Sequence, residues 1–384
     1  MRGSVAIAGV GLAGCGEAPG WSEMEIAAAA AKNALADAGL TARDVDGIVI
    51  ASTNIFMSGL ALAEHLGVHP KFTESSMVGG SSFVGHLVPA MLALNAGLCD
   101  TILVAYGSNQ RTGTGRAEAG RYKMALDPQP FEHPYKPFNP PSSYALATAR
   151  HMHQYGTTRT QLAEIAVAAR RWAQLNPEAF SREPLTVEEV LKSRMVSDPL
   201  TVRDCCLVTD GGGAYVLTRA ERAKGFAKPP AYLLGVGAAH WHRQISSMPD
   251  LTVTAATESG QRAYEMAGVG PKDVDVVELY DAFTINTLLF LEDLGFCKKG
   301  EGGAFVSGGR IAPGGRLPVN TNGGGLSCVH PGMYGIFLVI EAVRQLRGEA
   351  GARQVQDAAV ALAHGNGGVL SSQITAILGT QDTL

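Results

Sequence analysis

Cysteine is scarce in this sequence, and the few cysteines lack the spacing of a metal site or a disulfide framework. The chain has 384 residues and six cysteines, with no CxxC pair. Structural zinc sites use closely spaced thiolates, and disulfide frameworks are typical of short, cysteine-rich secreted chains. We therefore expect no metal, no disulfide framework and no bound cofactor, and a reducing cytoplasm as the location.

Charge of either sign is also scarce. Charged residues make up 17% of the chain, the net charge is -4, and no dense basic block occurs. Nucleic-acid-binding proteins carry clustered lysine and arginine, so nucleic acid is not an expected partner. No uninterrupted apolar run approaches the roughly 18 residues of a membrane span. The N-terminus leads directly into a strand pattern, so we expect neither a membrane segment nor a secretion signal.

Apolar residues are abundant, at 46% of the chain, and glycine occurs 47 times. This composition supplies a sizeable core, and the length indicates about two domains or one fused pair. The first glycine cluster, Gly9-Val-Gly-Leu-Ala-Gly14, has the spacing of a dinucleotide-binding turn. That turn needs a helix opening directly on the glycines, but Pro19 and Gly20 intervene. We therefore predict a simple strand-to-loop turn after a strand at residues 4–9.

Two patterns occur twice along the chain. Residues 38–46 and 267–275 share a glycine stop and an Asp-Val-Asp turn at identical spacing, each between a helix and an apolar strand. Residues 83–105 and 335–363 both read as a helix, a glycine and a strand. Self-similarity of this kind indicates two related α/β halves. We place them at residues 1–225 and 226–384.

An insertion of a different kind, at about residues 110–200, interrupts the first half. Residues 122–143 contain six prolines and cannot form a regular element. Helices are expected at residues 144–154 and 160–174. We expect this insertion to form a cap over the functional site.

The most informative stretch is residues 320–335, which place three glycines, His330 and Tyr334 between a strand end and a helix start. Glycine allows a ligand to approach the backbone closely, and a helix start offers unpaired N–H groups. The stretch can therefore hold a polarised carbonyl beside an imidazole and a phenol. A tight turn with a buried histidine is the alternative interpretation.

Taken in order, these motifs resemble the thiolase superfamily. The resemblance rests on the duplicated halves, the Asp210-Gly-Gly-Gly strand, His330-Pro331 before Gly335, and His364-Gly-Asn-Gly-Gly368. It covers essentially the whole chain and implies a five-layered αβαβα fold, usually dimeric. The Glu278-Leu-Tyr-Asp-Ala-Phe283 motif is similar to that of the sterol carrier protein-x-type, or lipid-transfer, branch.

The chain departs from the thiolase pattern where thiolases carry their reactive cysteines. The resemblance places the acyl-carrying cysteine at Gly80, or at Ser81 or Ser82 after a small shift, and the second cysteine at His364. Tyr280 replaces the motif asparagine, and Tyr334 stands where thiolases have a small residue. This pattern is similar to the thiolase-like aldolases of steroid side-chain degradation, which work with tyrosines and associate with a small OB-fold/zinc-ribbon protein.

The expected reaction is retro-aldol cleavage of a β-hydroxyacyl-CoA, with coenzyme A present as part of the substrate. One tyrosine would deprotonate the β-hydroxyl group, which requires a stabilised phenolate because the usual pKa of tyrosine is about 10. The other tyrosine would orient the hydroxyl group or protonate the enolate. The predicted catalytic residues are Tyr280, His330, Tyr334 and His364, and the predicted binding residues are Gly80, Ser81, Ser82, Gly324 and Gly367.

Two other functions stay open at this level. The first is a thiolase or other acyltransferase that uses a serine, or Cys328, as its nucleophile. The second is a subunit that binds acyl-CoA without catalysis, because both reactive cysteines are lost. The sequence does not indicate the acyl group.

Overall fold

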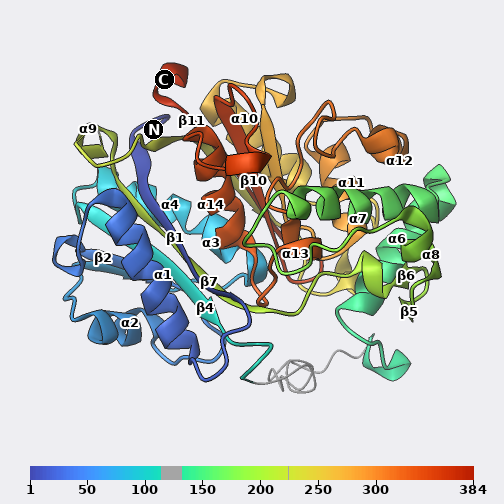
Figure 1. Cartoon of the computed structure of the whole chain (residues 1–384), viewed down its shortest axis with the longest axis horizontal. Helices are drawn as coiled ribbons and strands as arrows, with labels where there is room; N and C mark the ends of the chain where they lie inside the picture. The colour runs from blue at the N-terminus through green and yellow to red at the C-terminus, as the bar shows by residue number, and fades with distance from the viewer. Residues whose placement is uncertain (114–131, 224) are drawn as a thin grey trace.

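A large mixed sheet runs through the centre of the molecule (Figure 1). The computed structural model describes residues 1–113, 132–223 and 225–384. Within them the sheet has nine strands in the order β3-β2-β4-β7-β1-β8-β11-β10-β9. The strands are β1 (Val5–Gly16), β2 (Gly47–Ile50), β3 (Phe72–Glu74), β4 (Thr101–Ser108), β7 (Asp210–Arg219), β8 (Ala231–His240), β9 (Val276–Leu279), β10 (Val360–Gly367) and β11 (Ser372–Gly379).

The second half of the sheet repeats the pairing pattern of the first half. β2 is parallel to β4, β4 is antiparallel to β7, and β7 is antiparallel to β1. In the same way β9 is parallel to β10, β10 is antiparallel to β11, and β11 is antiparallel to β8. The halves meet where β1 and β8 pair side by side. The boundary at residues 225 and 226, which falls between α9 (Ala220–Ala223) and β8, stays a prediction.

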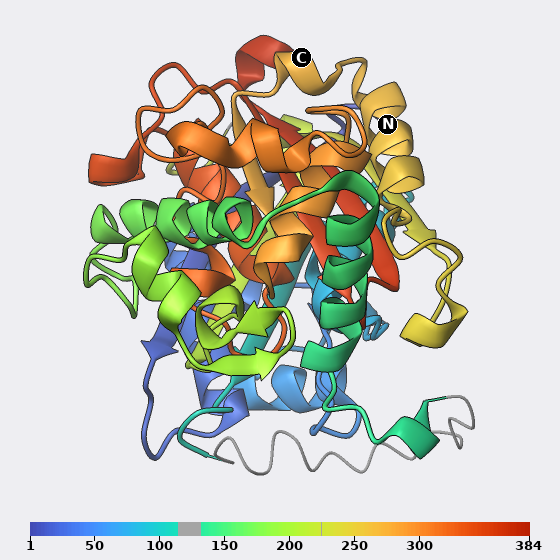
Figure 2. The ribbon, with the colours of Figure 1, turned by 90° about the vertical axis from the view of Figure 1, so that its right-hand side faces the viewer.

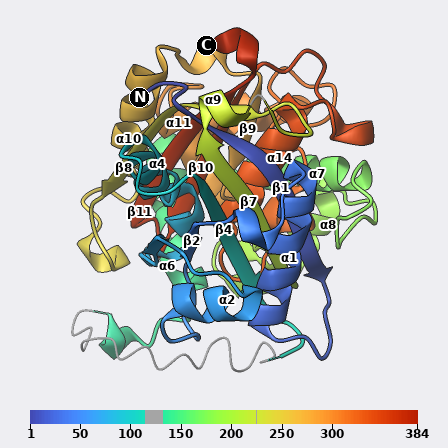
Figure 3. The ribbon, with the colours of Figure 1, turned by 90° about the vertical axis from the view of Figure 1, so that its left-hand side faces the viewer.

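Helices cover both faces of the sheet and also fill the space between its halves. α1 (Glu23–Ala38) and α2 (Ser58–Leu66) pack outside the first half, and α10 (Ala256–Ala267) and α11 (Thr284–Asp293) pack outside the second. α3 (Ser82–Gly85), α4 (Leu87–Asn95) and α14 (Gly335–Leu346) form the central layer, in which α3 and α14 contact strands of the second half and α4 and α14 contact β7 (Figures 1 and 3). The expected five-layered α/β arrangement of a thiolase is therefore confirmed.

The glycine cluster at residues 9–14 lies inside a strand, so the predicted turn is wrong. β1 continues to Gly16 without leaving the sheet. A Cβ atom on Gly9 or Gly11 would overlap the backbone of α1 at Ala34. These glycines therefore let the alanine-rich helix rest directly on the strand, which is a packing role and not a turn.

The helix expected at residues 83–95 is interrupted at His86, which separates α3 from α4. Pro89 lies one turn later and has no N–H group to return to the carbonyl of residue 85. The sequence spacing of Ser22 and Glu25 predicts a capping box at a helix start, and the structure confirms it, because the two residues form both hydrogen bonds of that motif before α1.

The insertion packs against the second half of the molecule (Figures 1 and 2). Both expected helices are present, as α6 (Pro141–Tyr155) and α7 (Arg159–Gln174). Residues 114–131, which include much of the proline-rich stretch, lie outside the described residues. The described part of the proline-rich stretch contains a 3-10 helix (His133–Tyr135) and the first residues of α6, so the prediction that it forms no regular element is wrong there. The region also contains α8 (Val187–Lys192), β5 (Met195–Ser197) and β6 (Leu200–Thr201), and its neighbours include α12 (Gly302–Val306) and α13 (Gly324–Ser327).

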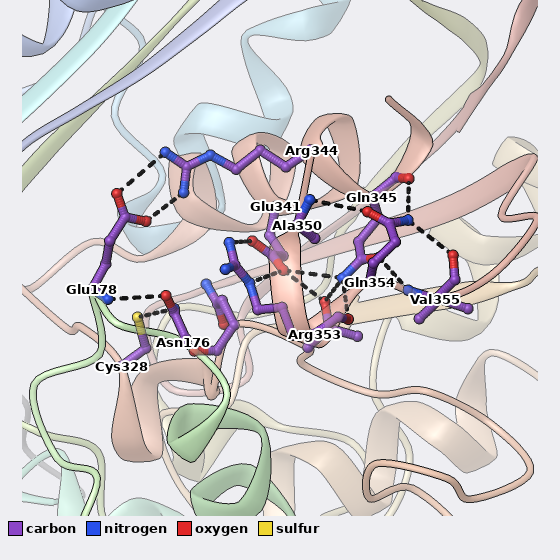
Figure 4. A network of polar contacts seen from close by, with 12 residues as sticks. Asn176, Glu178, Cys328, Glu341, Arg344, Gln345, Ala350, Arg353, Gln354 and Val355 are labelled. Carbon is purple, nitrogen blue, oxygen red and sulfur yellow. Dashed lines mark hydrogen bonds and ion pairs between the residues drawn. The ribbon is translucent and has the colours of Figure 1, made fainter. Parts of the chain in front are cut away.

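A buried ion pair supports the central helix α14 (Figure 4). Arg353 makes two hydrogen bonds to the carboxylate of Glu341, at 2.8 and 2.9 Å. The hydroxyl group of Thr321 lies 2.9 Å from that carboxylate and 2.7 Å from the carboxyl group of Glu278. Asn176 donates a hydrogen bond to the carbonyl of residue 322 at 2.9 Å. These hydrogen bonds hold the first residues of the 320–335 stretch against the core.

Candidate active site

The turn from His330 to Tyr334, which leads into α14, is fixed by two tyrosine hydroxyl groups. Tyr106 reaches it from β4 and hydrogen-bonds the carbonyl of residue 331 and the N–H group of residue 333. Tyr280, directly after β9, donates to the carbonyl of residue 332 and accepts the N–H group of Tyr334, both at 3.2 Å. One tyrosine from each half therefore shapes the turn.

Three of the four predicted catalytic side chains come together at this turn. The Tyr280 ring meets His330 edge to face at 5.6 Å and Tyr334 edge to face at 5.7 Å. The rings of His330 and Tyr334 are stacked, with centroids 6.1 Å apart. All three side chains are buried. Residues some fifty positions apart in sequence thus form one cluster.

His330 presents an unpartnered ring nitrogen inside this cluster. Its Nε2 atom has no hydrogen-bond partner among the residues that the structure describes, although the side chain is only 8% exposed. Burial lowers the pKa of His330 to about 4, so the ring is neutral at physiological pH. A buried polar atom without a partner is uncommon and calls for an explanation. A hydrogen-bonding group of a bound ligand would supply that partner.

The two tyrosines of the cluster are suited to donate protons and not to accept them. Burial raises the pKa of Tyr280 and of Tyr334 well above 10. The nearby charges that act on Tyr334 are acidic, led by Asp281, and its hydroxyl group donates to Asn322 Oδ1 at 3.0 Å. His330 is neutral and supplies no positive charge. The N–H group of Tyr334 is a donor to the oxygen atom of Tyr280, and a stabilised phenolate on either tyrosine stays a prediction.

Gly80 lies directly beneath Tyr280. A Cβ atom on Gly80 would overlap the ring and the hydroxyl group of that tyrosine. A Cβ atom on Gly79 would lie 2.7 Å from the N atom of Gly368 and 3.0 Å from the Cα atom of Gly367. The structure thus places Gly367 of the second half against the turn of the first half that contains Gly80, and a binding role for these glycines stays a prediction.

The predicted serines are held by local hydrogen bonds. Ser82 Oγ donates to the carbonyl of residue 79 at 2.7 Å and accepts the N–H group of residue 78 at 2.9 Å. Ser81 Oγ lies 2.8 Å from Ser372 Oγ, which lies 2.9 Å from His240 Nδ1. Ser81 therefore has an indirect connection to a histidine, whereas the hydrogen bonds of Ser82 lead only to its own loop.

His364 faces away from the cluster. Its Nδ1 atom lies 2.9 Å from Thr375 Oγ1, its Nε2 atom lies 2.9 Å from Gln373 Oε1, and its ring packs on Phe290 of α11. Gly365, the next residue of β10, faces the Gly79–Ser81 turn, so strand alternation turns His364 toward the outer helices. Burial lowers its pKa to about 3. A catalytic role for His364 stays a prediction that this geometry does not support.

The sequence analysis missed Asp281, although it directly follows Tyr280. Its Oδ1 atom accepts the N–H group of Gly325 at 2.6 Å, and its Oδ2 atom accepts that of Leu326 at 3.3 Å. A Cβ atom on Gly324, a predicted binding residue, would overlap this carboxylate. Burial raises the pKa of Asp281 to about 7. The available signal was a carboxylate placed directly after a buried strand, beside a predicted catalytic residue.

A cavity of about 470 Å³ lies beside this cluster, between the insertion and the Gly324–Ser327 helix. Three arginines line it, Arg111, Arg170 and Arg203, together with Glu17, which pairs with Arg111 at 2.7 Å. Its inner wall includes Leu326, whose N–H group contacts Asp281. Sequence reasoning missed this site because the arginines come from separate segments and form no motif.

Neither metal ligation nor membrane insertion is indicated in the part of the chain that the structure describes. Within residues 1–113, 132–223 and 225–384, no cluster of three or more His, Cys, Asp or Glu side chains is arranged to hold a metal ion. In the same ranges, no helix is both long enough and apolar enough to cross a membrane.

Comparison with known proteins gives the family. A steroid side-chain-cleaving aldolase of Thermomonospora curvata is 35% identical over 360 residues, which cover 91% of each chain. This chain belongs to the thiolase superfamily. A thiolase C-terminal domain-like family model also matches residues 237–380 of this superfamily member.

Two further relatives of this thiolase-superfamily chain span nearly its whole length. An acetyl-CoA acetyltransferase of Methanothermobacter thermautotrophicus is 34% identical over 374 residues, which cover 95% of this chain and 96% of the relative. The solved structure of the Ltp2-ChsH2(DUF35) aldolase superposes with a TM-score of 0.89 at 33% identity, covering 99% of this chain and 98% of the other. The resemblance predicted from the motifs is confirmed.

Proposed function

We propose that this thiolase-superfamily member cleaves the Cα–Cβ bond of a β-hydroxyacyl-CoA by a retro-aldol reaction. The β-hydroxyl group loses its proton and becomes the carbonyl of an aldehyde or ketone. The electron pair of the broken bond moves into the thioester as an enolate, and a proton added at Cα gives the shorter acyl-CoA. No covalent enzyme intermediate is required.

The observation that carries this proposal is the contact between Gly80 and Tyr280. At the position where the resemblance places an acyl-carrying cysteine, the chain has no side chain, and a phenol fills the space. Covalent acyl transfer needs an activated nucleophile at that point. The contact therefore favours a reaction that proceeds without one, as the name of the Thermomonospora curvata aldolase also suggests.

The remaining polar groups fit the stabilisation of an enolate. His330 Nε2 is available to hydrogen-bond the thioester oxygen, and fixed donors of this kind typically contribute about 3 kcal/mol to transition-state stabilisation. The hydroxyl groups of Tyr280 and Tyr334 are the acids of the site, because burial keeps both protonated. Side chains of this protein can therefore both hold the enolate and protonate it.

The arginine-lined cavity supports coenzyme A as the carrier of the substrate. Arg170 and Arg203 lie close enough for the charge of Arg203, together with burial, to lower the pKa of Arg170. Arginine side chains that lie close together attract an anion, and coenzyme A carries phosphate groups. Because Leu326 joins this cavity to Asp281, a thioester held there lies beside the cluster.

The proposal is tested by mixing the protein with a panel of β-hydroxyacyl-CoA and saturated acyl-CoA compounds. Released aldehyde or ketone is measured by chromatography, and covalent adducts are sought by mass spectrometry of the intact protein. We expect cleavage of a β-hydroxyacyl-CoA and no adduct. An added acyl mass would contradict the proposal, and binding without any turnover would favour a non-catalytic subunit.

Acyl transfer is the second candidate, and the chain from Ser81 through Ser372 to His240 favours it. Through Ser372, His240 can draw the proton of the Ser81 hydroxyl group, which lies beside Gly80. An acyl adduct on Ser81 that disappears in Ser81→Ala and weakens in His240→Gln would establish this function. A matched control is Ser82→Ala, since the hydroxyl group of Ser82 bonds to the backbone of its own loop.

The assembly and location of the protein are part of the same proposal. In the described sheet β3 is an edge strand, and large apolar side chains are exposed near it, among them Phe56 at 87% and Met77 at 43%. Exposed edges and apolar patches are usually covered by a partner. We propose a homodimer in the cytoplasm, and an OB-fold/zinc-ribbon partner of the kind that the name Ltp2-ChsH2(DUF35) aldolase suggests. Analytical ultracentrifugation of the wild type and Phe56→Asp tests the dimer.

A further inference from the structure

We propose that Cys206 is a modification site for coenzyme A disulfide, and that the mixed disulfide formed there blocks the substrate. This inference rests on the proposed function, from which it takes the coenzyme A carrier, and it names a way in which the same site is regulated. It starts from two adjacent free thiols, Cys205 and Cys206, which are only partly buried and which both line the arginine-lined cavity.

The backbone that carries Cys206 contacts the cavity and also the loops that hold the cluster. The N–H group of Cys206 donates to the carbonyl of Ala282 at 2.8 Å, directly after the Tyr280 motif. The N–H group of the next residue donates to the carbonyl of Gly325 at 2.9 Å, at the start of α13. The thiol is therefore placed where the cavity reaches the cluster.

The two adjacent thiols face different surroundings. Cys205 has an extended backbone, and its thiol group lies 3.3 Å from the carbonyl of Thr201 in its own turn. Burial raises the pKa of Tyr280 and of Tyr144, and the charge of a Cys206 thiolate adds to both shifts, so this sulfur atom lies near both rings. Successive side chains of an extended segment point to opposite sides, which agrees with this difference. Cys206 is therefore the thiol on the cluster side.

A bound acyl-CoA would bring its own sulfur atom to the same region. The arginines attract its phosphate groups, and one of them, Arg203, precedes Cys206 by three residues. Its thioester lies at the other end of the carrier, where His330 Nε2 has no hydrogen-bond partner among the described residues. The His330 ring borders Gly325, whose carbonyl accepts the N–H group of Leu207. The sulfur of the carrier and the Cys206 thiol thus share one region.

The proposed step is thiol–disulfide exchange, in which atoms and electrons balance. The Cys206 thiolate attacks one sulfur atom of coenzyme A disulfide, and the disulfide bond of the reagent breaks as the protein–coenzyme A disulfide forms. The second coenzyme A leaves as a thiolate and takes up the proton that Cys206 has lost. One disulfide replaces another, so no further oxidant is needed. A small dithiol such as dithiothreitol reverses the exchange.

The test is to incubate the reduced protein with coenzyme A disulfide and to record the mass of the intact protein. We expect a single added coenzyme A, which peptide mapping places on Cys206 and dithiothreitol removes. Cys206→Ser should form no adduct. Cys297→Ser is the matched control and should react as the wild type does, because Cys297 is a partly buried free thiol that does not line this cavity. No adduct, or attachment at another cysteine, would overturn the inference.

Recognition of the carrier is tested with a neutral reagent, 2-hydroxyethyl disulfide. Arg203→Ala should slow the reaction of Cys206 with coenzyme A disulfide at least about fivefold, because the variant lacks a cation that attracts phosphate. The same substitution should change the rate with the neutral disulfide less than about twofold, because thiol access is unchanged. Equal slowing with both reagents, or no slowing with either, would overturn recognition of coenzyme A at this site.

The outcomes separate this inference from the proposed function. Cleavage of a β-hydroxyacyl-CoA is first measured on the reduced protein, before any disulfide is added. Cleavage without formation of the adduct would overturn the modification site alone, and the adduct without cleavage would overturn the retro-aldol function alone. With both present, the activity of the wild type should fall in proportion to the modified fraction and return with dithiothreitol. Cys206→Ser should keep its activity during the same exposure, and equal inactivation of both proteins would overturn the inference.

Discussion

At the scale of single residues, burial sets the protonation of the polar groups in the cluster around Tyr280. Tyr280, Tyr334 and Asp281 are all buried, and desolvation is the largest cause of each raised pKa. The tyrosines stay protonated, while the carboxyl group titrates near neutral pH. Tyr280 and Asp281 are adjacent in sequence, yet one stays protonated and the other titrates near neutral pH, because the same burial acts on groups with different intrinsic pKa values.

Replacing Tyr334 by phenylalanine should remove an acid without changing the packing. We expect kcat to fall about 100- to 1,000-fold, with little change in the binding of saturated acyl-CoA. Steady-state kinetics and calorimetry measure the two effects. The control is Tyr264→Phe, whose partly buried hydroxyl group binds the carbonyl of residue 294 in the outer layer. Equal losses in both variants would show that buried phenols matter only for stability.

The ionised carboxylate of Asp281 should lower the free energy of unfolding at high pH. Its pKa is raised from 3.8 to about 7, so the folded state binds the proton more tightly than the unfolded state. The cost is fully present above pH 7 and disappears as the pH falls from about 7 to about 4. Asp281→Asn should therefore gain up to about 4 kcal/mol at pH 8 relative to pH 4. Urea unfolding at several pH values measures this, and a pH-independent difference would contradict it.

At the scale of elements, glycines decide how closely the loops of the two halves approach. The Gly79–Ser81 turn, the start of α14 and the end of β10 meet with no side chain between them. Gly335 and Gly365 both face this turn directly. The site is therefore built from backbone contacts between equivalent elements of the two halves.

The contact between Gly80 and Tyr280 predicts strong coupling between the two positions. Gly80→Ala should destabilise the fold by about 1 to 3 kcal/mol, because the added methyl group overlaps the phenol. In a Tyr280→Ala background the same change should cost almost nothing. A double-mutant cycle by urea unfolding measures the coupling. Gly270→Ala is the control, since its Cβ atom would meet nothing closer than 3.9 Å. If the effects of the two substitutions on the free energy of unfolding are additive, the side chain of Tyr280 does not contact Gly80.

At the scale of the whole molecule, a buried charge pair links α14 to the segment that carries the site. Arg353 is the cation next to Glu341 (Figure 4). The Glu278 carboxyl group joins the same network through Thr321. Burial and the charge of Glu341 raise the pKa of Glu278, so one of the two carboxyl groups is protonated. The pair thus supports the 320–335 stretch over a long distance in sequence.

Arg353→Met should destabilise the protein by about 3 to 5 kcal/mol, because Glu341 is left as an uncompensated buried charge. Arg262→Met is the control, because its pair with Glu258 is exposed and should contribute less than about 1 kcal/mol. Thermal and urea unfolding measure both variants. A similar small loss in each would contradict the role of the buried pair.

Sequence patterns predicted the fold well because the repeat is local and periodic. The capping box at Ser22, the paired helix and strand patterns and the motif order around His330 each depend on residues close in sequence. The Gly9–Gly14 turn was wrong because the reason for those glycines is a helix that packs on them from residue 34. A pattern among neighbouring residues in the sequence does not predict such a contact.

The sequence by itself determined the superfamily and the repeated pattern of the two halves, because these are properties of ordered motifs. The tertiary structure alone decided which polar groups share a site. It placed Tyr280 over Gly80, joined Asp281 to the cluster and turned His364 toward Phe290. Strand alternation and burial set these outcomes, and both depend on packing between segments that are distant in the chain.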